Sequence, residues 1–154
     1  MRAGNTFDAV GALRNGLVWA MGWSAACLLA FGVMWLAGRV NPAVSLKMVL
    51  FLAFRFAIWG ALAGAFFWGL LAVLERVGRA RPLAEASSAR FGILGAIATA
   101  AFVPLTMQLF NLISGDGLAA WADVLDDLLW VMPLGGAAAV ATLKLAQRRA
   151  RSAA

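Results

Sequence analysis

The chain has 154 residues, of which 64% are hydrophobic and 13% charged, and its formal net charge is +6. Soluble domains contain about 25% charged residues, so this composition excludes an ordinary soluble domain. The basic excess does not indicate nucleic-acid binding, because the Lys and Arg residues flank apolar stretches instead of forming one soluble face. A membrane span needs about 20 mainly apolar residues, and the chain has four such stretches. We therefore predict an all-α, integral membrane four-helix bundle, with residues 1–154 forming a single transmembrane domain.

The first predicted span covers about residues 16–38. Its apolar stretch exceeds the roughly 7–15 residues of a signal-peptide core, and it continues past Cys27. We therefore interpret it as a retained span and not as a secretory or lipoprotein signal. Because Cys27 is the only cysteine, no disulfide is possible within the chain. Trp19 and Trp23 are expected at the inner membrane interface, where tryptophan is enriched.

Residues 43–55 separate the first span from the second, which is predicted at about 56–77. Asn41-Pro42 marks the end of the first helix, and Lys47 and Arg55 interrupt the apolar sequence that follows. Either the second helix is long and tilted, or an interfacial segment leads into it. We favour the interfacial segment, because a helix over 43–78 would rise about 54 Å across a hydrocarbon core of about 30 Å.

The third and fourth spans are predicted at about 91–113 and 128–146. Pro104 lies inside the third span and is expected to kink it. The connection that follows is acidic and is expected to form a solvated loop and the first turn of a helix, where Asp is favourable. Pro133 lies about one turn inside the predicted fourth span, a position at which proline is tolerated.

The distribution of charge predicts the orientation of the four spans. Cytoplasmic segments carry an excess of Lys and Arg, so the more basic side should face the cytoplasm, with both termini there and anionic lipid headgroups as partners. The richness in Ala, Gly, Leu and Arg is typical of a GC-rich bacterial genome, which indicates a bacterial inner membrane. The more basic side carries Arg2, Arg14, Arg76, Arg79, Arg81, Arg90, Lys144, Arg148, Arg149 and Arg151, whereas the other side carries Arg39, Lys47, Arg55, Asp116, Asp123, Asp126 and Asp127.

Small residues mark the predicted contacts between helices. Lipid competes equally for apolar side chains, so membrane helices associate where small residues let their backbones approach. These faces serve either packing within one bundle, which we favour, or docking of another subunit. The predicted packing residues are Gly60 and Gly64 in the second span, Gly92 and Ala96 in the third, and Gly135 and Gly136 in the fourth.

The two halves of the chain share a weak internal similarity. Residues 14–20 (RNGLVWA) are similar to residues 90–96 (RFGILGA), at an offset of 76 from position 14 to position 90. A duplicated helical hairpin with parallel repeats would produce this pattern. Chance matching between apolar sequences of low diversity would produce it as well, so both explanations stay open.

Residues with catalytic or metal-binding chemistry are scarce. The chain has no His, no Tyr and one Cys, so the commonest general base, the commonest metal ligand and a thiolate cluster are all missing. No Gly-rich phosphate-binding loop ends in Lys-Ser or Lys-Thr. We therefore expect no enzymatic activity, no bound metal and no cofactor.

The polar candidates lie near the predicted outer ends of the spans. Gln108 and Asn111 are one helical turn apart in the third span and form the best candidate for a polar site. Arg55 is the ionisable residue nearest to the centre of a span, and we expect it to extend towards the outer interface. There it would pair with Asp126 or Asp127 at the start of the fourth span.

Two functions fit this pattern. The first is a non-enzymatic accessory membrane subunit that packs against itself or against a larger bacterial complex, for which a photosynthetic or respiratory assembly is a candidate. The second is a minimal transporter or channel that works as an oligomer, with Gln108, Asn111 and Arg55 near its outer mouth. A partner that co-purifies at fixed stoichiometry would favour the subunit, and solute flux through the protein alone would favour the transporter.

Overall fold

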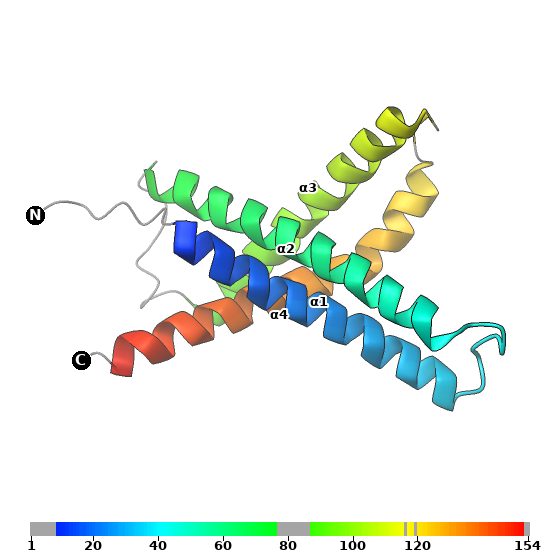
Figure 1. Ribbon diagram of the computed structural model, residues 1–154. Coiled ribbons are helices and arrows are strands. Elements are labelled where there is room, and N and C mark those ends of the chain that lie inside the picture. Colours follow the sequence, from blue (N-terminus) through cyan, green and yellow to red (C-terminus); the bar gives the residue numbers. More distant parts are fainter. Residues whose placement is uncertain (1–8, 77–86, 116, 119, 153–154) are drawn as a thin grey trace, which may run out of the picture.

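The protein is built from four long helices, shown in the computed structural model of Figure 1, which describes residues 9–76, 87–115, 117–118 and 120–152. Within these residues there is no strand. Each helix is long and apolar enough to cross a membrane. The predicted all-α four-helix bundle is therefore confirmed, and the chain has the features of a multi-pass membrane protein. The helices are α1 (Ala9–Leu36), α2 (Leu46–Arg76), α3 (Ser88–Ser114) and α4 (Trp121–Ser152).

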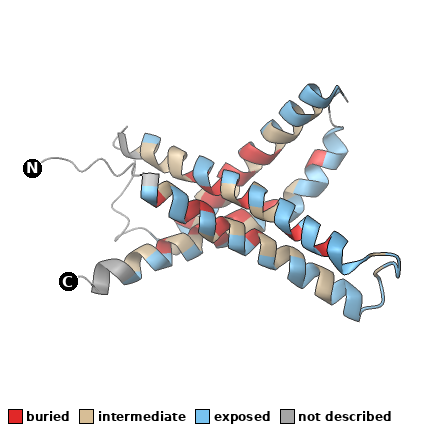
Figure 2. Ribbon diagram, in the orientation of Figure 1, coloured by how far each residue is buried: buried red, intermediate tan, exposed pale blue. Residues whose placement is uncertain are grey.

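The helices form two antiparallel hairpins that cross. α1 packs along α2 and α3 along α4, while between the hairpins α1 contacts α4 and α2 contacts α3. We call the end at which the two helices of a hairpin are connected its tip, and the opposite end its base. In Figure 1 the two bases lie on the same side of the molecule as the N- and C-termini, and the two tips point apart. Buried residues are concentrated where the hairpins cross, and exposed residues dominate towards the tips (Figure 2).

The helix boundaries of the two hairpins are similar at the offset of 76. Shifting α2 by the offset of 76 places it at 122–152, beside the observed 121–152 of α4, and shifting α1 gives 85–112, beside the observed 88–114 of α3. Exchanging the hairpins also exchanges the two contacts between them, α1 with α4 and α3 with α2. Parallel repeats related by an axis along the membrane normal have this arrangement. An ordinary bundle of four antiparallel helices has the same contacts, so duplication and chance similarity both stay open.

The segment before the second span belongs to a long helix. α2 is one helix of 31 residues, so the expected interfacial segment is instead the beginning of α2 from Leu46 onward. Ser45 accepts a hydrogen bond from the Met48 N–H at 3.3 Å and starts the helix, and no Gly or Pro follows before Gly60. At 1.5 Å per residue α2 is about 46 Å long, which exceeds the roughly 30 Å core, so the helix either tilts or extends beyond the core.

The fourth helix also begins earlier than predicted. α4 starts at Trp121 and includes Asp123 in its first turn, where the carboxylate interacts favourably with the positive end of the helix dipole. Pro133 consequently lies about three turns inside the helix and not in its first turns, so the expected first-turn position was wrong. Membrane helices tolerate internal proline because neighbouring groups satisfy the freed carbonyl. α3 is likewise one helix through Pro104.

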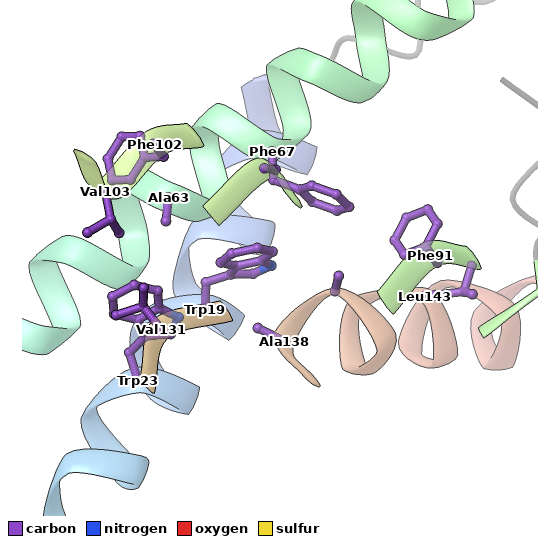
Figure 3. Close-up of a cluster of buried hydrophobic side chains, with 12 residues drawn as sticks. Trp19, Trp23, Ala63, Phe67, Phe91, Phe102, Val103, Val131, Ala138 and Leu143 are labelled. Carbon is purple, nitrogen blue, oxygen red and sulfur yellow. The ribbon is translucent and has the colours of Figure 1, made fainter. Parts of the chain in front are cut away.

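Aromatic side chains fill the crossing of the hairpins (Figure 3). Trp19 and Trp23 are 0% and 2% exposed, so they are core residues and not the interfacial residues that the sequence predicted. The Trp19 ring lies 5.2 Å from Phe67 of α2, and Phe67 in turn lies edge-on to Phe91 of α3 at 5.3 Å. This row of rings connects three helices across the crossing.

Candidate functional site

A buried hydrogen-bond network joins three helices near the crossing. Asn15 of α1 is only 2% exposed, and its Nδ2 donates to the backbone carbonyl of Gly64 in α2 at 2.6 Å. Its Oδ1 accepts from the Thr142 hydroxyl of α4 at 2.8 Å. The same hydroxyl lies 3.0 Å from the Ala138 carbonyl, so its one proton is shared between two acceptors. The amide of Asn15 thus links both hairpins.

Glycines on α2 create the space for this network. A Cβ on Gly64 would lie 2.9 Å from the Trp19 Cβ and 3.1 Å from the Gly16 Cα, and a Cβ on Gly60 would lie 2.7 Å from the Trp19 carbonyl oxygen. The predicted packing face Gly60–Gly64 therefore lies against α1 of the same chain. The resulting close approach brings the Gly64 carbonyl within reach of Asn15, and one of its two lone pairs accepts the amide.

The second hairpin is closed by small residues of its own. A Cβ on Gly136 would lie 3.1 Å from the Gly92 carbonyl oxygen and 3.7 Å from the Ala96 Cβ. The contact is closer at Gly95 and Gly135, where an added Cβ would meet the Ala139 Cβ and the Thr99 hydroxyl, respectively. The backbones also approach there, because a Cβ on Gly95 would lie 2.7 Å from the Gly135 carbonyl oxygen and one on Gly135 would lie 3.0 Å from that of Gly95. The predicted residues thus lie at the contact between α3 and α4. Gly95 was missed, because the Gly92–Ala96 spacing suggested a neighbouring face of the helix.

Three indole N–H groups in the α1–α2 hairpin are buried without a hydrogen-bond partner. They are the Nε1 atoms of Trp19, Trp23 and Trp68. Trp68 packs on α1 at Gly11, where a Cβ would lie 2.8 Å from the indole Cζ2. Burying a donor without a partner costs about 1–3 kcal/mol of folding free energy. These indole N–H groups are therefore donors that a polar partner near the network would satisfy.

The chemistry available at the crossing is hydrogen bonding. The network offers an amide, a hydroxyl and indole donors, and none of these groups titrates near neutral pH. Among the described residues no group of three or more His, Cys, Asp or Glu could hold a metal ion. This arrangement can fix the packing of helices or contact a polar solute, and it contains no general acid or base.

The predicted polar site at the outer ends is dispersed. Gln108 and Asn111 are half-buried on α3, whereas Arg55 on α2 and Asp126 and Asp127 on α4 are exposed. Because the tips point apart (Figure 1), Arg55 forms no ion pair with either Asp in the described part of the chain. The structure instead gathers its buried polar groups at the crossing. Asn15 escaped sequence reasoning because it precedes the predicted span, which was placed from residue 16 onward.

Basic side chains lie at the bases of the hairpins. Those that the structure describes are exposed to the surroundings of the bundle and could contact lipid headgroups. Arg2, Arg79 and Arg81 of the predicted cytoplasmic set lie outside the described residues. The exposed basic residues at the bases are Arg14, Arg90, Lys144 and Arg148, and those at the tip of the first hairpin are Arg39 and Lys47.

Comparison of the chain with protein-family models, with curated proteins and with solved structures gave no match.

Proposed function

We propose that this chain is a small, non-enzymatic membrane subunit that packs against a second copy of itself or against a larger bacterial membrane complex as an accessory component. The observation that carries this proposal is the division of surface within the bundle. The small-residue faces form the contacts inside the two hairpins. Yet only 11% to 28% of the residues in the most apolar stretch of each helix are buried within the chain. Most of each helix is therefore left for lipid or for another membrane protein.

The chemistry of the crossing supports a packing role. Both ends of the Asn15 amide are satisfied within the chain, by the Gly64 carbonyl and the Thr142 hydroxyl. Such interhelical hydrogen bonds in membrane proteins contribute on average about 0.6 kcal/mol each to stability. Bonds of this strength suit a structural role in which they fix the register of the helices. An enzyme would need a nucleophile or a titratable group beside this network.

We place the hairpin bases on the cytoplasmic side of a bacterial inner membrane. The described basic residues at the bases, Arg14, Arg90, Lys144 and Arg148, are exposed and would attract anionic headgroups by about 1 kcal/mol each near the surface. The acidic start of α4 lies at the opposite end of its helix, in agreement with the rule that basic residues stay inside.

A minimal transporter or channel is the second candidate, and the Asn15–Thr142 network favours it. Polar groups buried within membrane spans mark solute pathways in many transporters. In this alternative a polar solute would exchange hydrogen bonds with Asn15 and with the unpartnered indole N–H groups of Trp19 and Trp23.

Purification and flux measurements separate the two candidates. We expect native mass spectrometry of the affinity-tagged chain, extracted in mild detergent, to detect an oligomer or a complex with a partner at fixed stoichiometry. Liposomes that contain the chain alone should release ions or small polar solutes no faster than empty liposomes. Flux that appears with the wild-type chain and disappears with Asn15→Ala would establish the transporter and refute the accessory role.

A further inference from the structure

Arg55 occupies an unfavourable position for a charge. It lies nine residues after the start of α2, which corresponds to about 14 Å along the helix, and its side chain is exposed. Its neighbours Phe54 and Ile58 are 62% and 46% exposed, so the surface around Arg55 is apolar. A guanidinium facing lipid is costly unless it reaches the interface or an opposite charge.

The opposite charges of the chain lie on the other hairpin. Asp126 and Asp127 follow the start of α4 by five and six residues, about 8 to 9 Å along that helix. Counted from the starts of their helices, these positions differ from that of Arg55 by only about 5 Å along the helix, which an extended arginine side chain covers. Both Asp side chains are exposed, and within the described residues neither pairs with Arg55. The two helices are not a packed pair, because the tips point apart.

The charged residues also begin where the contact between the hairpins ends. Arg55 precedes Trp59 by one turn, and the Trp59 ring packs against Phe102 of α3 at 6.2 Å. Asp127 precedes Val131 by one turn, and Val131 belongs to the core cluster at the crossing (Figure 3). Residues four apart share a helix face. Arg55 therefore lies one turn before a residue that packs against α3, and Asp127 lies one turn before a core residue of α4, each on the side towards the tip.

We propose that two copies of the chain associate side by side through their hairpin tips, with Arg55 of each copy paired with Asp126 and Asp127 of the other. A twofold axis along the membrane normal forms both contacts at once, because such an interface uses the same surfaces of both copies. Both charge sets lie on one chain at similar distances from the starts of their helices, which favours a second copy over an unrelated protein. This inference rests on the proposed function and names the partner of the subunit.

Apolar residues beside the charges would complete the contact. Ile58 follows Arg55 by about one turn, and Leu129 and Trp130 follow the Asp pair, at 74% and 76% exposed. Side chains of this size surround and dehydrate ion pairs at the centre of protein interfaces. The same dehydration strengthens the attraction between the charges.

Charge reversal tests the pairing in lipid bilayers. Single-molecule photobleaching counts copies per particle for the wild type, for Arg55→Asp and for the double variant Asp126→Lys/Asp127→Lys. We expect each variant to weaken dimerisation at least about tenfold, because every ion pair becomes a repulsion. Lys47→Asp reverses an exposed basic residue near the same tip and should leave the dimer unchanged. Arg55→Gln and Asp126→Asn/Asp127→Asn repeat the test by neutralising the charges, without adding a basic residue to the outer side that would oppose the predicted orientation. Circular dichroism verifies the helix content of every variant.

Mixing the variants identifies where the pairs form. Copies with Arg55→Asp, mixed with copies that carry Asp126→Lys/Asp127→Lys, should regain wild-type dimerisation, because both pairs between such copies are again opposite in charge. The alternative is that the mixture does not recover, whereas a single chain that carries Arg55→Asp, Asp126→Lys and Asp127→Lys together does. That result would show that the hairpin tips close on each other within a copy, and would overturn the inference. A monomeric wild type would overturn it as well. A monomer that still purifies with another protein would leave the accessory function standing, whereas solute flux would refute that function independently of the dimer.

Discussion

The substitution Gly60→Ala tests whether the close contact between α1 and α2 holds the first hairpin together. The added Cβ would lie 2.7 Å from the Trp19 carbonyl oxygen and 2.9 Å from the Trp23 Cγ. Ordinary contact begins at 3.4 Å, so the helices must separate there by about 0.7 Å, the difference between the two distances. A gap of 0.5 to 1 Å forfeits roughly a quarter to a half of each neighbouring dispersion contact.

The expected cost of this separation exceeds the gain in helix propensity. Overpacking a close contact costs about 1–3 kcal/mol, while alanine gains up to about 1 kcal/mol over glycine in a helix. We therefore expect Gly60→Ala to lower the free energy of unfolding by about 1–2 kcal/mol. Separation of the helices would also lengthen the 2.6 Å bond from Asn15 to the Gly64 carbonyl.

Unfolding by sodium dodecyl sulfate in dodecyl maltoside micelles, followed by tryptophan fluorescence and circular dichroism, measures this change. Gly69→Ala on the same helix is the matched control, because a Cβ there meets nothing within 4 Å. It should gain up to about 1 kcal/mol from helix propensity alone. If Gly60→Ala proves as stable as Gly69→Ala, the two helices are not held by this contact and the reasoning fails.

The remaining predictions concern the network and the orientation of the chain. Asn15→Ala should lower the free energy of unfolding by about 1 kcal/mol, because two interhelical bonds of roughly 0.6 kcal/mol are lost. Thr142→Val should cost about half as much, and the double variant should cost less than the two together, since both remove the same bond; strict additivity would contradict the network. In a Cys27→Ala background, an impermeant maleimide should label Lys47→Cys in intact cells and Arg14→Cys only after permeabilisation. Labelling in the reverse order would contradict the cytoplasmic position of the hairpin bases.

Apolar length was sufficient to predict the four helices and their class. Each predicted span lies almost wholly within an observed helix, since long apolar stretches in lipid must satisfy their backbone hydrogen bonds internally. The lengths were underestimated, because the criterion was the thickness of the hydrocarbon core. Nothing in that criterion ends a helix at the membrane surface. α2 and α4 therefore extend through Arg55 and Asp126.

The buried site could be predicted only in part. The spacing of Gly60 and Gly64 predicted a close helix contact, and the structure places them against α1. The partner across that contact was not evident, because apolar helices give no signal that distinguishes lipid from protein. For this reason Trp19 was expected at the interface, although it packs against Gly60 and Gly64 and is fully buried. Asn15 became visible as a buried residue only when the crossing of the hairpins was known.

Gly16 and Gly92 allow a further comparison, because they are 76 positions apart and match in the weak similarity between the two halves of the chain. A Cβ on Gly16 would lie 3.3 Å from the Ala61 carbonyl oxygen, and one on Gly92 would lie 3.1 Å from the Val140 Cγ2. The backbone of Ala61 moves only with its helix, whereas the Val140 methyl group gives way through small side-chain adjustments. We therefore expect Gly16→Ala to cost about 1 kcal/mol and Gly92→Ala to be nearly neutral, because the gain in helix propensity offsets its smaller strain.

The same unfolding assay measures both variants, with Gly22→Ala as the control on α1, where a Cβ meets nothing within 4 Å. If both substitutions lower the free energy of unfolding equally, the kind of atom contacted does not decide the effect, and the reasoning fails. The expected difference would instead show that the kind of atom contacted decides the cost. Gly16 faces a backbone carbonyl of the neighbouring helix, whereas Gly92 faces a side chain at the matching position of the second hairpin.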